Sequence, residues 1–189
     1  MHRLLILILA LPLLGACMRP AETGGAKLSL NAPRLTTASA ARRNDPPAEF
    51  DIREAEHALN AYRQKYNLPP LTPNPVLMKT ARAHARDLAF HNKVSHTGSD
   101  GLNPAQRLTR AGYSWSSVGE NVSAGRNSIA EVIQAWHNSP SHRPNLQHRL
   151  ATEFGMAVVH NPKSTLSNYW VLLVAAPKKK SGFNLRIGG

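Results

Sequence analysis

An imidazole, a guanidinium and a carboxamide follow one another within four residues, at His142, Arg143 and Asn145. They come after Pro140, which cannot continue a helix and disfavours helical geometry at Ser139 before it. Polar groups gathered directly after the end of a helix are typical of loops that carry function. The alternative is a polar turn whose residues cap one another.

Two more polar side chains stand in unusual local settings. His96 lies in a turn that contains Gly98 and Gly101, so loop backbone holds it rather than a helix face. Glu120 interrupts a stretch with a strand pattern, where an acidic residue goes against β propensity, and such a conflict suggests a site. His84, in contrast, falls on the apolar stripe of a helix, where a hydrogen-bonded core histidine is more common than a ligand.

Helices and strands alternate in the part of the chain that must position these groups. Hydrophobic periodicity and capping residues predict helices over 52–66, 75–91, 104–108 and 129–136, and strands over 116–125, 154–160 and 169–176. Asn60 and Arg63 share one edge of the first helix, either solvated or bracing a neighbouring loop. Ser128 and Glu131 form a capping box, which gives Glu131 a structural role. The elements predict an α+β fold, a small mixed sheet covered by about four helices, with one self-sufficient core.

The first residues have the order of a bacterial lipoprotein signal. A basic start precedes an apolar run over 4–14, which is too short to span a bilayer, and small residues then precede Cys17. This order resembles the lipobox of lipoproteins, which implies cleavage before Cys17, its acylation, and a protein held on a membrane without a spanning helix. Met18 after the cysteine implies, by the same resemblance, the outer membrane of a double-membraned bacterium. The alternative is an ordinary secretory signal with an incidental cysteine nearby.

Composition limits the kinds of site and of binding partner that the chain can have. Cys17 is the single cysteine, so the mature chain has neither internal disulfides nor a catalytic thiol. Residues 18 to about 48 lack an apolar period and predict a flexible tether. The formal net charge is +12, but the arginines are scattered and the one lysine run lies at 178–180, so nucleic acid is not the expected partner. A basic protein facing anionic lipid heads or wall polymers explains the charge as well.

Seven short motifs in sequence order resemble a known family. They are Asn60-x-x-Arg63, Ala-x-x-His84-Ala, Ser95-His96 with Asp100-Gly101, Ala111-Gly112-Tyr113, Gly119-Glu120-Asn121, Trp136-x-x-Ser-Pro-x-His142-Arg143-x-Asn145-Leu146 and Tyr169-Trp170. From about residue 50 to 176 the chain is similar to the bacterial branch of the CAP superfamily (cysteine-rich secretory proteins, antigen 5 and pathogenesis-related 1), also called SCP domains. The resemblance implies a single α-β-α sandwich. The expected organisation is a signal peptide at 1–16, the lipidated cysteine and tether at 17–48, a CAP domain at 49–177 and a basic tail at 178–189.

The resemblance also implies a cleft lined by two histidines and two glutamates. His96, Glu120 and His142 match three of these positions, and Ser139 stands at the fourth, where eukaryotic relatives carry the second glutamate. Asp100 and Glu131 are the two carboxylates available to compensate for it. Asn121, in the motif of Glu120, completes the expected ligand-binding set of His96, Glu120, His142, Ser139 and Asn121.

Three kinds of chemistry suit this set. Two imidazoles, His96 and His142, with a carboxylate are zinc ligands that leave a position open for water, which would support metal-assisted hydrolysis. The same groups are a general acid and base without metal. The third possibility is pure recognition of a ligand head group. The sequence has no Gly-x-Ser-x-Gly and no His-Glu-x-x-His motif. Shared metal ligation would require the two imidazoles to lie within about 5 Å of one another.

The leading hypothesis is an envelope-anchored CAP lipoprotein, monomeric, that binds a lipid or other small ligand rather than turning it over. The alternative is a hydrolase acting on peptides, lipids or cell-wall polymers, which would use either zinc or no cofactor. A module that presents its basic surface to a partner protein is a third possibility.

Overall fold

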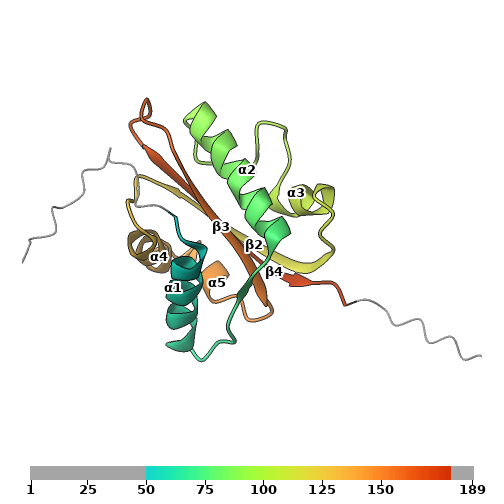
Figure 1. The fold of residues 1–189 in the computed structure, drawn as a ribbon. Helices are drawn as coiled ribbons and strands as arrows, with labels where there is room; N and C mark the ends of the chain where they lie inside the picture. Colours follow the sequence, from blue (N-terminus) through green and yellow to red (C-terminus); the bar gives the residue numbers. More distant parts are fainter. Residues whose placement is uncertain (1–49, 180–189) are drawn as a thin grey trace, which may run out of the picture. The chain divides into compact units, whose positions relative to one another are not determined.

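The computed structural model describes residues 50–179 (Figure 1). The elements are α1 (Ile52–Gln64), β1 (Thr72–Pro73), α2 (Pro75–His91), α3 (Pro104–Arg110), β2 (Trp115–Ala124), α4 (Ile129–Asn138), α5 (Arg143–Leu146), β3 (Glu153–His160) and β4 (Asn168–Pro177). The predicted signal peptide, Cys17, the tether and nearly all of the tail lie outside these residues. Between residues 50 and 179, no helix has the length and apolarity needed to cross a bilayer.

Side-chain caps define where the longer helices begin. Asn74 accepts hydrogen bonds from the second and third amides of α2, and Asn103 forms a full capping box with Gln106 at the start of α3. At α4, Ser128 accepts from the amide of Glu131, but the Glu131 carboxylate accepts from the amide of Asn127. Glu131 thus has the structural role expected from the sequence.

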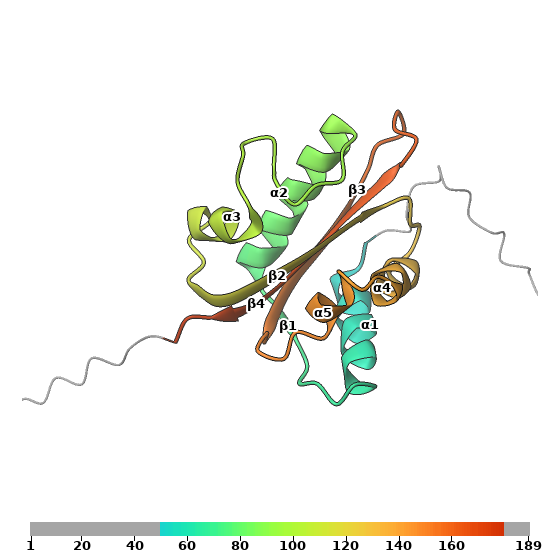
Figure 2. The ribbon, with the colours of Figure 1, turned by 180° about the vertical axis from the view of Figure 1, so that it is seen from behind.

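The four-stranded sheet has the order β1-β3-β4-β2 and mixed direction. β1 runs parallel to β3, while β3–β4 and β4–β2 are antiparallel. Figures 1 and 2 show α1, α4 and α5 on one face of this sheet and α2 and α3 on the other. The predicted α-β-α sandwich is therefore confirmed.

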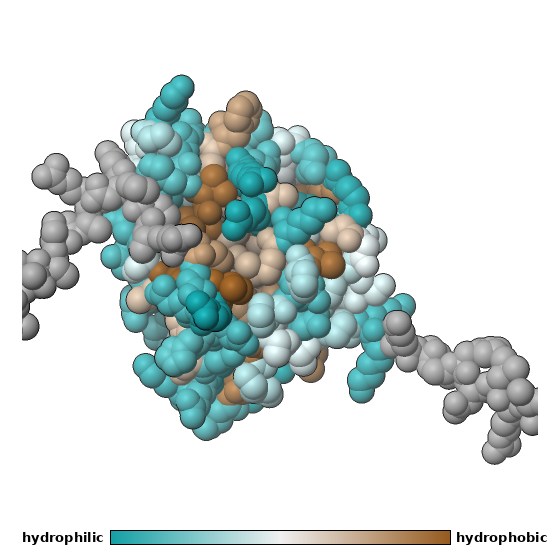
Figure 3. All heavy atoms as spheres, in the orientation of Figure 1, coloured by the Kyte–Doolittle hydropathy of each residue, from teal (hydrophilic) through white to brown (hydrophobic). Residues whose placement is uncertain are grey.

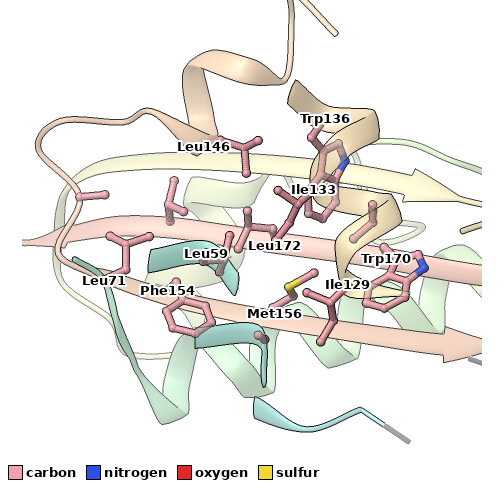
Figure 4. Close-up of a cluster of buried hydrophobic side chains, with 14 residues drawn as sticks. Leu59, Leu71, Ile129, Ile133, Trp136, Leu146, Phe154, Met156, Trp170 and Leu172 are labelled. Atoms are coloured by element: carbon pink, nitrogen blue, oxygen red, sulfur yellow. The ribbon is translucent and has the colours of Figure 1, made fainter. Parts of the chain in front are cut away.

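The central strand β4 is buried on both faces and separates two apolar clusters. Trp170, Leu172 and Val174 pack with α1, α4 and α5, as the close-up in Figure 4 shows for the first two of them. The alternate residues, Val171 and Leu173 among them, pack with α2 and α3. This alternation is the period of two that a strand imposes.

Two short elements were not predicted. β1 has two residues and lies where the sequence indicates a break between helices. α5 is a single turn where a loop was expected, and a side chain from outside the turn binds its last carbonyl, that of Leu146. The buried guanidinium of Arg63 donates from Nη1 to the carbonyl of Leu146 (3.0 Å) and from Nη2 to that of His148 (3.2 Å). Arg63 therefore braces a distant loop, one of the two roles expected for it.

Candidate functional site

The edge strand β2 divides the Gly119-Glu120-Asn121 motif between the two faces of the sheet. Glu120 pairs in register with Leu173, which belongs to the α2/α3 cluster, and Asn121 pairs with Leu172, which belongs to the α1/α4 cluster. Side chains at these two positions therefore point to opposite faces. The site is built at this edge, from one loop on each face.

Glu120 is the centre of the contacts on the α2/α3 face. It is 5% exposed, and both carboxylate oxygens are occupied by other side chains. Oε1 contacts Nδ1 of His96 at 2.9 Å, and Oε2 accepts a hydrogen bond from Nη2 of Arg107 at 2.5 Å. The carboxylate is thus buried, and both of its oxygens are hydrogen-bonded to other side chains.

Arg107 is a site residue that the sequence reasoning missed. Besides Glu120, its guanidinium binds the carbonyls of His96 (2.9 Å) and Leu102 (2.6 Å) through Nη1. It thereby fastens the loop that carries His96 to the sheet. No local sequence signal identified Arg107, because its burial follows from the packing of α3 and not from its neighbours in the chain.

His84 lies next to the Glu120 carboxylate. It is a core histidine, as its position on the apolar stripe of a helix indicated. It is 2% exposed, its Nε2 lies 2.9 Å from the carbonyl of Ser95, and the same nitrogen is 3.9 Å from Oε1 of Glu120. Since a carbonyl can only accept, Nε2 carries the proton. Burial lowers the pKa of His84, against the opposing effect of Glu120.

His142 comes to the same edge from the α4/α5 face. Its Nδ1 lies 2.8 Å from the hydroxyl oxygen of Ser139, and its backbone carbonyl accepts a hydrogen bond from the Asn121 amide (3.0 Å). Ser139 thus contacts the imidazole from the position at which the family resemblance implies the second glutamate of eukaryotic members. Its hydroxyl also lies 3.0 Å from that of Ser141.

Asn145 and Arg143 brace this loop. The Asn145 amide donates to the carbonyl of Glu120 (2.8 Å) and to the side-chain oxygen of Asn121 (2.9 Å), while Nε of Arg143 donates to the carbonyl of His137 (2.6 Å). A Cβ at Gly119 would lie 2.6 Å from the side-chain oxygen of Asn145. Glycine is needed there because the loop approaches the strand so closely.

The two site histidines face each other with different electrostatics. Their ring centroids are 6.3 Å apart and the rings are tilted by 42°. The hydrogen bond to Glu120 raises the pKa of His96, whose side chain is 54% exposed. Burial, and then the charge of His96, lower the pKa of His142. One ring therefore favours the charged form, and its neighbour favours the neutral form.

The donor set does not suit a zinc ion held by three protein ligands. Both Nδ1 atoms and both oxygens of Glu120 are engaged, which leaves one ring nitrogen on each of His96 and His142. Asp100 binds Arg110 (2.7 Å), so it does not replace the second glutamate. Among residues 50–179, no three His, Cys, Asp or Glu side chains are grouped to hold a metal. Zinc ligation by His96 and His142 stays a prediction, limited to two ring nitrogens.

Comparison with known proteins gives one family and two curated relatives. The model of the family described as "CAP: Cysteine-rich secretory protein family" matches residues 56–174. "Uncharacterized protein YkwD" of Bacillus subtilis is 34% identical over 102 residues, 54% of this chain and 40% of that protein. An uncharacterized protein of Borreliella burgdorferi is 33% identical over 84 residues, 44% of this chain and 53% of that protein. The alignments thus span about half of these relatives or less.

Two solved structures have the same arrangement of elements. An outer surface protein from Borrelia burgdorferi superposes with a TM-score of 0.60 at 26% identity, over 70% of this chain and 99% of that one. An extracellular SCP-domain protein of Bacillus anthracis gives a TM-score of 0.58 at 23% identity, over 66% of this chain and 39% of that one. The second likeness concerns the fold alone.

Proposed function

The chain belongs to the cysteine-rich secretory protein (CAP) family, and from this we propose that it is an envelope-anchored lipoprotein that binds a lipid or other small ligand at His96 and His142. The lipobox-like order before Cys17 supports the anchor. The similarity to an outer surface protein of Borrelia burgdorferi supports a location in the cell envelope.

The hydrogen bonds of the Glu120 carboxylate are the observation that favours ligand binding over catalysis. Its carboxylate is buried and bound by His96 and Arg107, so it is not free to take a proton from a substrate or to ligate a metal. Its role is to orient His96 and to raise the pKa of that ring, which favours the charged form. The groups offered to a ligand are then the Nε2 atoms of His96 and His142, which suit a carbonyl or anionic head group.

One observation favours the alternative, an acid–base hydrolase. The pKa of His96 is raised and that of His142 is lowered, and two titratable neighbours pushed apart in this way can divide the roles of acid and base. In this mechanism His96 would protonate a leaving group while His142 takes a proton from water. Ser139 is hydrogen-bonded to Nδ1 of His142, but among the described residues no carboxylate orients that ring, as a serine nucleophile would require.

Mass spectrometry of co-purifying small molecules tests the binding proposal. The wild-type chain, extracted from its own membranes, should carry a lipid or other small molecule that the double variant His96→Ala/His142→Ala has lost. His57→Ala, an exposed histidine change on α1, is the matched control and should retain it. The same ligand on wild type and double variant would exclude the proposed site.

Fractionation tests the anchor separately. Replacing Cys17 with serine removes the thiol that acylation needs, so the protein should move from the membrane fraction to the soluble fraction. Retention of Cys17→Ser in the membrane fraction would contradict the lipoprotein proposal without bearing on ligand binding.

A further inference from the structure

We propose that Trp115 is the centre of a binding site for a glycan chain whose sugars carry acetamido groups and carboxylates. Two hollows, of about 420 and 300 Å³, are both lined by Trp115 and Thr109. The first extends along α3 to Gln106, and the second extends to Ser114 and to Lys178, which follows β4. The indole therefore borders two neighbouring spaces, which suits a chain of linked rings better than a single small molecule.

A β-bulge turns Trp115 towards α3. Trp115 pairs with Pro177 and Ser117 pairs with Ala176, so β2 has one residue more than β4 between these pairs. In a regular strand, Trp115 would share the face of Ser117, whose hydroxyl contacts His148 beyond α5. Instead, Trp115 packs against the α2/α3 cluster. Bulges are common at sheet edges and beside functional sites, where they redirect a side chain in this way.

The indole ring is held in position before any ligand arrives. Trp115 is half-buried, and its Nε1–H donates to Oγ1 of Thr109 at 3.0 Å. The Thr109 hydroxyl in turn donates to the carbonyl of Ala105 at 3.1 Å. The accessible part of the ring is therefore its apolar surface. A sugar can place its C–H groups against the negative face of an aromatic ring, and a ring already fixed loses little freedom on binding.

The free polar groups beside the indole are donors. Oε1 of Gln106 accepts from the amide of Asn103 (3.0 Å), which leaves Nε2 of Gln106 without an acceptor among residues 50–179. The backbone amide of Lys178 donates to the Ser114 carbonyl (2.9 Å), and its ammonium has no acidic partner within the described part of the chain. Such donors match the oxygens of an acetamido group and of a carboxylate, whereas sugars with hydroxyls alone also need acceptors.

This site is separate from the histidine site. Neither hollow is lined by His96, Glu120 or His142, and Arg107 lines neither of them. Figure 3 shows hydrophilic and intermediate residues with a few apolar ones among them around α3, a surface that suits a polar ligand with apolar ring faces. The inference therefore goes beyond the proposed function and does not depend on it.

Tryptophan fluorescence of the full chain tests the proposal. The chain has three tryptophans, and Trp136 and Trp170 are each 1% exposed, so Trp115 is the one that a ligand can reach. Soluble peptidoglycan fragments of alternating N-acetylglucosamine and N-acetylmuramic acid should shift its emission to the blue and saturate. Chitotetraose lacks the carboxylates and should bind about threefold more weakly. Cellotetraose lacks the acetamido groups too and should bind about tenfold or more weakly.

Variants at the indole and at α3 locate the site by calorimetry. Trp115→Ala should weaken binding of the peptidoglycan fragments about tenfold or more, and Trp115→Tyr, which keeps an aromatic face, should lose less. Phe90→Ala, at an 81% exposed position of α2, is the matched control and should bind as wild type. Gln106→Glu keeps the acceptor of the capping box but removes the amide donor, so it should also weaken binding and decides the question if Trp115→Ala does not fold.

A lysine variant tests the role of the carboxylate. Lys178→Gln should weaken binding of the peptidoglycan fragments about twofold to fivefold and leave chitotetraose binding unchanged, since only the former ligand is charged. Lys163→Gln, at an exposed position between β3 and β4, removes the same charge elsewhere and should change neither.

Three results would overturn the proposal. They are the absence of saturable binding, equal binding of cellotetraose, and wild-type binding by both Trp115→Ala and Gln106→Glu. A hyaluronan tetrasaccharide carries the same two chemical groups from a different source. If it binds, the shared chemistry is supported, and the tighter of the two ligands identifies the source of the glycan as a bacterial wall or as a host.

Discussion

Glu120 and Asn121 are neighbours on the edge strand β2, yet they hold two different loops on opposite faces of the sheet. Glu120 binds the loop of His96, with the help of Arg107. Asn121 binds the backbone of His142. The dipeptide therefore brings two histidines together from parts of the chain that lie far apart in sequence. A change at one position should affect the histidine on its own face first.

The Glu120→Gln variant should lower the pKa of His96. The hydrogen bond from His96 to the carboxylate is the main cause that raises this pKa, and a neutral amide removes the negative charge that favours the imidazolium. NMR titration of the imidazole signals measures the change. Glu131→Gln, an exposed change on α4, should leave the titration of His96 as it was, and an unshifted His96 in Glu120→Gln would contradict the proposed pairing.

The buried His84 should make the fold less stable as the pH falls. Its folded-state pKa is lowered by burial, so its contribution is present above about pH 6.5, the ordinary value, and is lost as the pH falls through the folded-state pKa. His96 acts in the opposite sense, because its pKa is raised. In His84→Gln, whose amide can still donate to the Ser95 carbonyl, the free energy of unfolding should fall less between pH 7 and 5. Urea unfolding at several pH values decides this, and an equally steep fall would refute it.

The Trp136→Ala variant should destabilise the fold by about 3–5 kcal/mol. Trp136 is 1% exposed, packs in the α1/α4 cluster, and donates from its indole nitrogen to the carbonyl of Val122 (3.2 Å). Its loss leaves a cavity and an unpaired carbonyl on β2. Urea denaturation gives the free energy, and Leu150→Ala at a 70% exposed position should change it by no more than about 0.5 kcal/mol.

The long elements could be predicted from sequence because their signals are local. Apolar periodicity and capping residues such as Asn74 and Ser128 indicated the four longer helices and three strands. α5 and β1 could not be found in this way, because distant contacts such as that of Arg63 with Leu146 stabilise them. The resemblance to a family supplied the layered arrangement, which local periodicity alone does not determine.

The sequence named the residues of the candidate site, but it did not indicate the contacts between them. His96, Glu120 and His142 were named from the motifs, but the burial of Glu120 depends on Arg107, which carries no motif. An arginine on a short helix has the same local sequence whether it faces solvent or a buried carboxylate. Its role follows from the packing of α3 beside β2, which is a tertiary property.

The zinc hypothesis has a direct test in calorimetry. Since two ring nitrogens are free and Glu120 is engaged, zinc should bind weakly, and His96→Ala/His142→Ala should abolish that binding while leaving the thermal unfolding curve intact. His57→Ala should bind zinc as wild type does. Unchanged zinc binding by the double variant would contradict the hypothesis of a metal site at these histidines.

A carboxylate at residue 139 should strengthen the binding of zinc by His142. The hydroxyl of Ser139 already lies 2.8 Å from Nδ1 of His142, so Ser139→Glu places a negative charge beside that ring. We expect the pKa of His142 to rise and zinc affinity to increase about tenfold or more. Ser141→Glu adds the same charge two residues away, at an exposed position, and should give a much smaller gain. Equal gains from the two variants would mean that general attraction of the cation, rather than the hydrogen bond between residue 139 and Nδ1 of His142, is responsible.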